Sequence, residues 1–191
     1  MHRMSRIAPL FALAVAVVSL MGFAAPRFQV TMLGPSSRTI PQGSYLSLAY
    51  SDYSPSEPVT PGFTWSRVPA GTASIAIVIT DANFRNAVHA ILYDLAPNRR
   101  VAFNEIRDDT TGVSEPRYSF GRNDFVAAFP EYPIYMPPLP PPGSRHRYVV
   151  TAYALRNSVG IDGLNIAQFR TAIRGQVLAK ATTFAYFLLP D

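Results

Sequence analysis

Apolar residues along most of this chain recur with a period of two, which is typical of β-strands. Two runs, 74–80 and 87–95, are apolar on both faces, as strands buried between two layers are. On the second run, a period of two places His89, Ile91 and Tyr93 on the same face. The sequence therefore predicts two central strands, the second of which carries a histidine into a buried environment.

A third strand follows a stretch that cannot be helical. Residues 136–143 contain five prolines, and each proline fixes φ and lacks an N–H. We therefore expect a stiff, extended wall that ends in a turn at Gly143. Residues 146–155 are rich in β-branched and aromatic side chains and predict a strand. Alternation along it places His146 and Tyr148 on one face and the neighbouring arginines on the other.

One segment near the C-terminus changes its period. Apolar residues between 166 and 178 recur at spacings of three and four, and Asn165 with Gln168 forms a capping box. These signals predict a helix that begins at Ile166 and ends near Lys180. Shorter strands are expected at 28–33, 45–50 and 182–189, a strand and turn at 63–71, and loops at 51–61 and 126–135.

The N-terminus has the pattern of a secretory signal peptide. Basic residues come first, residues 7–25 are almost all apolar, and small residues stand at Gly22 and Ala24. We expect cleavage after Ala24, which leaves 25–191 as a single domain without stable membrane insertion, either secreted or periplasmic. An uncleaved membrane anchor is the competing interpretation, because about twenty apolar residues can span a bilayer.

Composition narrows the class of protein. The chain has 191 residues, of which 48% are hydrophobic, and its 18 prolines and 11 glycines suit short strands joined by turns. Cysteine is absent, which excludes disulfides and thiolate metal sites. The net charge is +5, but no basic run is longer than the pair at Arg99 and Arg100, and no nucleic-acid motif is present. We expect no nucleic-acid partner and no cofactor.

Several short fragments, in order, carry a family resemblance. They are Pro69-Ala-Gly-Thr72, the strand that ends in Asp81, the strand that bears His89, Gly121-Arg-Asn-Asp-Phe125, Pro140-Pro-Pro-Gly143, His146-Arg-Tyr148, Tyr153-Ala-Leu155 and Leu178-Ala-Lys-Ala181. On the basis of these fragments, the chain resembles the phosphatidylethanolamine-binding protein family, and within it the bacterial branch similar to Raf kinase inhibitor protein. The resemblance covers about residues 63–181.

The resemblance implies a mostly β fold in which a large antiparallel sheet packs on a smaller sheet, with one helix near the C-terminus. It also implies a small anion-binding pocket that can take a phosphate-bearing head group. By position, the ligand-binding residues are Asp81, Asn83, His89, Pro141, His146 and Tyr148. No residue is assigned a catalytic role or a role as a metal ligand.

The chain departs from the family pattern at three places, one of which is the glycine-rich approach to the proline loop, where this chain has Tyr135-Met-Pro-Pro-Leu139. The family has Asp-Pro-Asp where this chain has Asp81, Ala82 and Asn83, and it has His-Trp where this chain has His89 and Ala90. A neutral amide at Asn83 repels an anion less than a carboxylate does and can donate hydrogen bonds, so we expect it to ease anion entry. Asp81 could instead cap a turn, and Tyr148 could be a core aromatic residue.

Three functional classes stay open on the sequence. The first is a non-enzymatic pocket protein that binds a small anion or a phospholipid head group. The second is a protein-interaction module, such as a protease or kinase inhibitor, that uses residues 129–136 as an exposed aromatic surface. The third is a metal-dependent hydrolase in which Asp81, His89 and His146 hold the metal. The sequence does not decide whether the chain forms a homodimer.

Overall fold

The protein is built from two antiparallel sheets and one α-helix. A computed structural model describes residues 27–102, 104–106 and 118–191. The predicted signal peptide, 1–24, lies outside the described residues. The strands are β1 (Gln29–Leu33), β2 (Thr39–Ile40), β3 (Gly62–Ser66), β4 (Ser74–Asp81), β5 (Ala87–Leu95), β6 (Ser119–Phe120), β7 (Arg145–Leu155) and β8 (Val177–Leu188), and the helix is α1 (Ile166–Ala172). Within the described ranges, no helix has the length and apolar character needed to cross a membrane.

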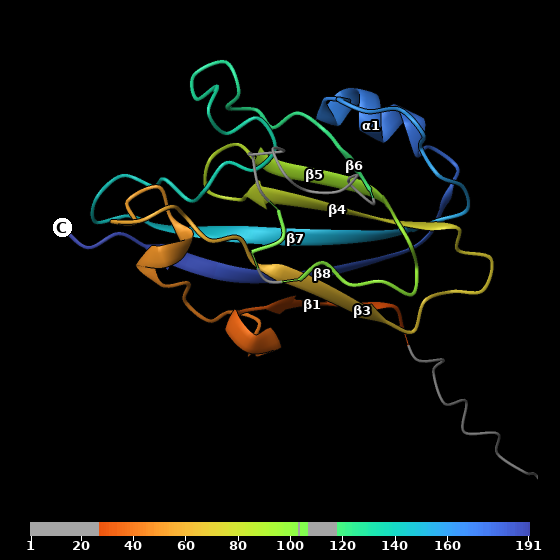
Figure 1. The fold of residues 1–191 in the computed structure, drawn as a ribbon, viewed down its shortest axis with the longest axis horizontal. Helices are drawn as coiled ribbons and strands as arrows, with labels where there is room; N and C mark the ends of the chain where they lie inside the picture. Colours follow the sequence, from red (N-terminus) through yellow and green to blue (C-terminus); the bar gives the residue numbers. More distant parts are fainter. Residues whose placement is uncertain (1–26, 103, 107–117) are drawn as a thin grey trace, which may run out of the picture.

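The larger sheet is the centre of the molecule. Its strand order is β6-β5-β4-β7-β8, and the smaller sheet has the order β2-β1-β3. The smaller sheet covers one face of the larger sheet, and α1 covers the other (Figure 1). This is the predicted fold class, a mostly β protein in which a large antiparallel sheet packs on a smaller one.

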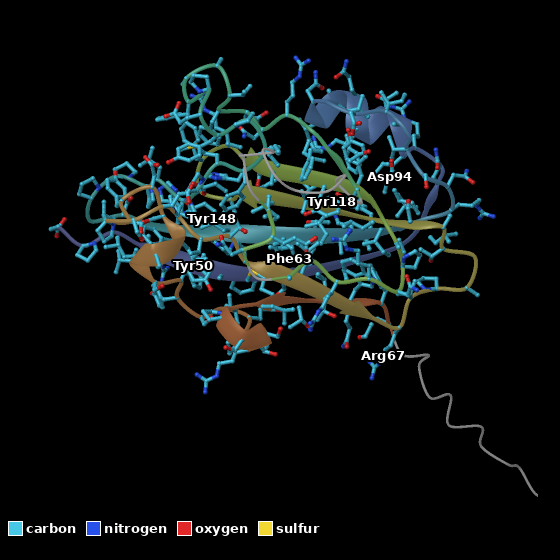
Figure 2. The ribbon with its side chains drawn as sticks, in the orientation of Figure 1. Tyr50, Phe63, Arg67, Asp94, Tyr118 and Tyr148 are labelled. Carbon is cyan, nitrogen blue, oxygen red and sulfur yellow. The ribbon has the colours of Figure 1, made fainter. Side chains whose placement is uncertain are left out.

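The main core lies between the two sheets. Ile75, Ile77 and Ile79 of β4 face this core, which also contains Phe63 of β3 (Figure 2). The opposite face of the same strands packs against Phe169 of α1. Because both faces are covered, β4 and β5 are buried along nearly their whole length, as their continuous apolar runs predict.

The helix begins as predicted but is shorter. Asn165 accepts hydrogen bonds from the backbone N–H groups of Ala167 and Gln168, and the Gln168 side chain accepts from the backbone N–H of Asn165. The predicted end near Lys180 is wrong, because α1 ends at Ala172. Gly175 has a φ of +75°, which stops the helix, and the following residues pair with β7 instead.

The strand predicted at 45–50 is also wrong. Only Tyr45 pairs in strand fashion, as an isolated parallel bridge to Tyr186 of β8. Residues Leu48–Tyr50 then form a short 3-10 helix that turns the chain away from the sheet. The bridge nevertheless matters, because it covers part of the outer edge of β8, where Leu46 N–H donates to the carbonyl of Tyr186.

Candidate functional site

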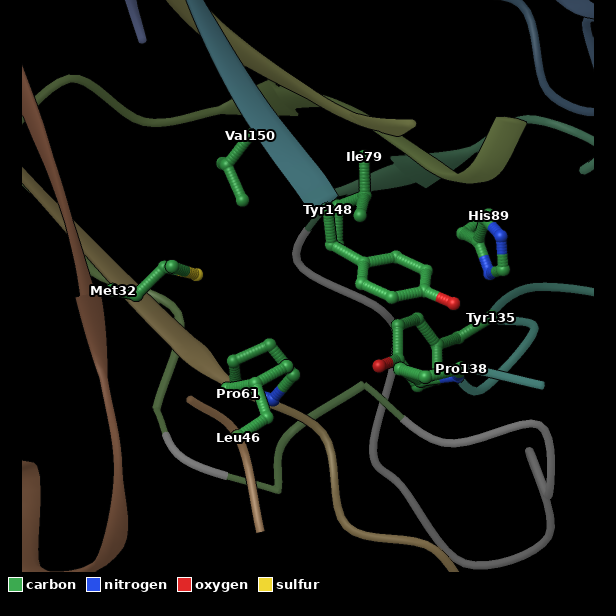
Figure 3. Close-up of a pocket in the computed structure, with 9 residues that line it drawn as sticks. All are labelled: Met32, Leu46, Pro61, Ile79, His89, Tyr135, Pro138, Tyr148 and Val150. Atoms are coloured by element: carbon green, nitrogen blue, oxygen red, sulfur yellow. The ribbon is translucent and has the colours of Figure 1, made fainter. Parts of the chain in front are cut away.

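A small cavity opens where β4, β5 and β7 approach the proline-rich stretch (Figure 3). Its lining residues are Met32, Leu46, Pro61, Ile79, His89, Tyr135, Pro138, Tyr148 and Val150. Most of these side chains are apolar, and the space between them has room for about one water molecule. Two polar side chains, His89 and Tyr148, give the cavity its chemistry.

His89 reaches the cavity because β5 contains a β-bulge. Ile79 pairs with Ala90 and Thr80 pairs with Val88, which leaves His89 as the extra residue between them. The prediction that His89 shares a face with Ile91 and Tyr93 is therefore wrong. Those two residues pack on the α1 side of the sheet, whereas the bulge turns His89 toward the other side.

Asp124 holds the backbone beside the bulge. The Val88 N–H donates to Asp124 Oδ2 at 2.8 Å, and the Asp124 N–H donates to the Val88 carbonyl at 2.9 Å. Asp124 comes from the polar segment 121–125, one of the fragments that carry the family resemblance. This segment therefore fixes the strand position from which His89 projects.

His89 is a neutral imidazole with a defined tautomer. Its Nδ1 lies 2.7 Å from the carbonyl oxygen of Met136, and because a carbonyl can only accept, Nδ1 carries the hydrogen. Burial lowers the pKa of His89 and outweighs the hydrogen bond to Met136 and the charge of Asp81, which raise it. Nε2 therefore presents a lone pair, and it is buried without a hydrogen-bond partner among the described residues.

Tyr148 supplies the complementary polar atom. Its ring meets the His89 ring edge-on at a centroid distance of 5.1 Å, and its hydroxyl is directed toward His89 (Figure 3). Burial, followed by the charge of Asp81, raises the pKa of Tyr148, so the hydroxyl keeps its proton. The backbone of Leu139 and the Asp81 carboxylate also influence this pKa, but in the part of the chain that the structure describes no group makes a hydrogen bond of normal geometry with the hydroxyl.

Asp81 and His146 form a pair beside the cavity. Asp81 Oδ2 lies 2.5 Å from His146 Nδ1, and the two side chains are only 5% and 15% exposed. Asp81 Oδ1 also accepts from the backbone N–H groups of Asn83 at 2.8 Å and Phe84 at 3.2 Å. Asp81 therefore caps the turn, which the sequence leaves open as an alternative to ligand binding, and it is also the partner of His146.

Two predicted site residues lie outside the cavity. Pro141 is exposed, and its carbonyl accepts from the Ser144 N–H in a turn. Asn83 is exposed, and its Oδ1 accepts from the Arg147 N–H at 2.9 Å. The structure thus brings together His89 and Tyr148, with Asp81 and His146 beside them, and separates Asn83 and Pro141 from them.

The wall of the cavity comes from residues that the sequence analysis does not single out. Tyr135 and Pro138 line the cavity from the side opposite the strands. A hydrogen bond holds Pro138 in place, because its carbonyl accepts from the Asp52 N–H at 3.1 Å. The proline run indicates a wall in this region, but which of its prolines faces inward depends on these tertiary contacts.

Two other features bear on the alternative functions. Among the described residues, no group of three or more histidine or acidic side chains is arranged to hold a metal ion. Within 129–136, Ile134, Tyr135 and Met136 are buried, whereas Phe129 and Tyr132 are only partly buried, so an exposed aromatic surface is limited to the first part of this segment. Ile134 and Tyr135 belong to the main core between the two sheets.

Comparison with known proteins agrees with this architecture. A family model described as phosphatidylethanolamine-binding protein matches residues 36–187, most of the chain. The fold is similar to that of E. coli YbcL, with a TM-score of 0.69 and 23% identity over 86% of this chain and 99% of that chain. It is also similar to CT736 from Chlamydia trachomatis, a putative homologue in the same family, with a TM-score of 0.64 and 21% identity over 83% and 96% of the two chains. No curated protein matches the chain.

Proposed function

The chain belongs to the phosphatidylethanolamine-binding protein family, and we propose that it is an exported, non-enzymatic protein whose cavity binds a small phosphate-bearing anion, free or as a phospholipid head group. One observation carries this proposal. His89 Nε2 and the Tyr148 hydroxyl face one cavity and are buried without a hydrogen bond of normal geometry among the described residues. A buried polar atom without a partner costs about 1–3 kcal/mol, which a ligand that bonds to both atoms would recover.

The two polar atoms define what the ligand must offer. Neutral His89 accepts a hydrogen bond at Nε2, and Tyr148 donates one from its hydroxyl. A phosphate monoester that carries one proton has both a donor oxygen and acceptor oxygens and matches this pair, whereas the phosphodiester of a phospholipid head group has acceptor oxygens only and matches Tyr148 alone. Because the cavity has room for about one water, we expect one ligand oxygen inside it and the rest of the ligand at the rim, near His146.

Two other parts of the proposal, export and the non-enzymatic role, rest on the sequence. Export rests on the predicted signal peptide at 1–24, and the non-enzymatic role rests on the family resemblance, by which no residue is assigned a catalytic role. The alternative of a protein-interaction module is left with Phe129 and Tyr132 at residues 129–136, because Ile134, Tyr135 and Met136 are buried. We therefore place the functional site at the cavity and not on this loop.

The substitution Tyr148→Phe tests the proposal. Phosphoethanolamine should raise the melting temperature of the wild-type protein, and the variant should bind it about 10- to 100-fold more weakly, because one hydrogen bond to a charged ligand contributes about 1.5–3 kcal/mol. The variant should fold as well as the wild type, since the lost hydroxyl has no partner of normal geometry among the described residues. Thermal shift and calorimetric titration measure both quantities.

Tyr153→Phe is the matched control. Tyr153 is a half-buried tyrosine of the same strand that packs against Phe169 on the opposite face, so its loss should leave phosphoethanolamine binding unchanged. Equal binding by wild type and Tyr148→Phe would place the ligand elsewhere. No stabilisation of the wild-type protein by either phosphate or phosphoethanolamine would remove the proposed function altogether.

A further inference from the structure

The outer face of β7 carries a second group of side chains, on the opposite side of the strand from His146 and Tyr148. Arg145 and Arg147 alternate with these two residues and are both exposed. Arg147 pairs across the strands with Tyr186 of β8. The two arginines and Tyr186 line a polar cleft that is separate from the cavity described above.

Aromatic rings hold both guanidinium groups in place. The Arg145 guanidinium carbon lies 4.7 Å from the ring centre of Tyr186, and that of Arg147 lies 5.6 Å from the ring centre of Phe184. Stacking uses the flat face of a guanidinium and leaves the N–H donors along its edge available, although the Arg145 guanidinium also interacts with the Tyr45 side chain. Across the part of the chain that the structure describes, neither arginine takes part in an ion pair.

Asn83 closes the cleft with a further donor. Its Oδ1 accepts from the Arg147 N–H at 2.9 Å, and the Ala82 N–H donates to the Arg147 carbonyl at 2.9 Å. These two bonds fix the loop after β4 against β7. Because a backbone N–H needs the oxygen of the Asn83 amide, the NH₂ group is left to donate to the cleft, which Asn83 also lines.

The surroundings of the cleft are basic. None of its five lining residues, Ala82, Asn83, Arg145, Arg147 and Tyr186, carries a carboxylate. From 145 to 191 the sequence has six basic residues and two acidic residues, Asp162 and Asp191. An anion that approaches this side of the protein therefore meets a positive field and donors that are already positioned.

We propose that Asn83, Arg145 and Arg147 form a second binding site, which takes a phosphate group on the outer face of β7 and β8. Side chains two residues apart on a strand are separated by roughly 7 Å, so the two guanidinium groups can approach one tetrahedral anion from two sides. Guanidinium groups match phosphate oxygens in a bidentate manner, which favours phosphate over a halide ion. The site shares no residue with the cavity and does not depend on the function proposed for it.

An isosteric change at Asn83 gives the sharpest test. Asn83→Asp keeps the oxygen that accepts from the Arg147 N–H, so the loop should stay in place. It also places a carboxylate in the cleft, where it pairs with the arginines and repels phosphate. In calorimetric titration with inorganic phosphate at low ionic strength, we expect this variant to lose at least tenfold in affinity at one of two sites.

The double variant Arg145→Gln/Arg147→Gln should lose the same site while keeping the other. Its matched control is Arg170→Gln/Arg174→Gln, which removes the same charge from α1 and the turn after it. Tyr148→Phe separates the two hypotheses, because it should weaken only the cavity site. Unchanged phosphate affinity in both Asn83→Asp and the Arg145/Arg147 variant would overturn the second site, as would an equal loss in the control.

A separate experiment distinguishes a lipid from a soluble source of the phosphate group. Vesicles of phosphatidylglycerol and phosphatidylcholine present phosphate on a lipid surface, whereas inorganic phosphate presents it free in solution. Sedimentation of the wild-type protein with these vesicles, reduced at least tenfold in the Arg145/Arg147 variant and unchanged in the control, would identify a lipid source. Phosphate binding without sedimentation would identify a soluble source.

Discussion

Phosphoethanolamine is expected to bind the cavity about tenfold more weakly for each unit of pH above 7. Burial lowers the pKa of His89, so its Nε2 has no hydrogen at this pH and can only accept. A phosphate monoester, with a second pKa of about 6, is largely without a proton above pH 7. The complex needs one proton between Nε2 and the ligand oxygen, and one proton taken up on binding changes the affinity tenfold per pH unit.

Sulfate should discriminate this mechanism from simple attraction between charges. Sulfate has the shape of phosphate but carries no proton near neutral pH, so it presents only acceptors to the lone pair of His89. We expect sulfate to bind roughly 10- to 100-fold more weakly than phosphate at pH 7.5, the cost of one unmade hydrogen bond to a charged group. Titration calorimetry in buffers of different ionisation enthalpy counts the protons taken up.

Two results would contradict this account. One is an affinity for phosphoethanolamine that is independent of pH between 7 and 9, and the other is equal affinity for phosphate and sulfate. His89→Gln is the informative variant, because an amide can donate to an unprotonated phosphate oxygen. It should reduce the pH dependence and narrow the preference for phosphate over sulfate.

The strands that build the site can be predicted from the sequence because their burial requires an apolar amino-acid composition. β4 and β5 are covered on both faces, and such strands need apolar residues at consecutive positions. The start of α1 is predictable for a local reason, since the capping box of Asn165 and Gln168 needs only neighbouring residues. The end of α1 is not, because pairing with β7 extends β8 back to Val177.

The candidate site is predictable only in part. His89 can be identified as a buried polar residue, but its face cannot, because a single bulge residue reverses the alternation of side chains. The position of Asn83 is predicted wrongly from the sequence for a similar reason. It follows the end of β4, where the turn capped by Asp81 directs it to the outer face of β7, against the expectation that it lines the anion pocket.

The proline wall shows a further limit of prediction from the sequence. All five prolines in 137–142 restrict the backbone in the same way, so the sequence does not distinguish Pro138, which lines the cavity, from Pro141, which is exposed. The distinction comes from long-range hydrogen bonds. The Met136 carbonyl accepts from His89, and the Pro138 carbonyl accepts from the Asp52 N–H.

The substitution Asp81→Ala is expected to lower the free energy of unfolding by about 3–5 kcal/mol. It removes the acceptor of the Asn83 and Phe84 N–H groups and leaves His146 without its partner in a site that is largely shielded from water. Breaking a buried pair from one side costs this much because the remaining group loses its compensation. Urea unfolding at pH 7 measures the change.

Asp81→Asn separates the two roles of this carboxylate. The asparagine keeps an oxygen for the Asn83 and Phe84 N–H groups, and its NH₂ faces His146, whose Nδ1 must then accept instead of donate. We therefore expect a loss of only about 1–2 kcal/mol, since one charge-assisted hydrogen bond is exchanged for a neutral one. Asp162→Ala, at an exposed position, is the matched control and should change stability by less than about 0.5 kcal/mol. Equal losses for Asp81→Ala and Asp81→Asn would mean that the pair with His146, and not the turn, accounts for the stability at this end of β4.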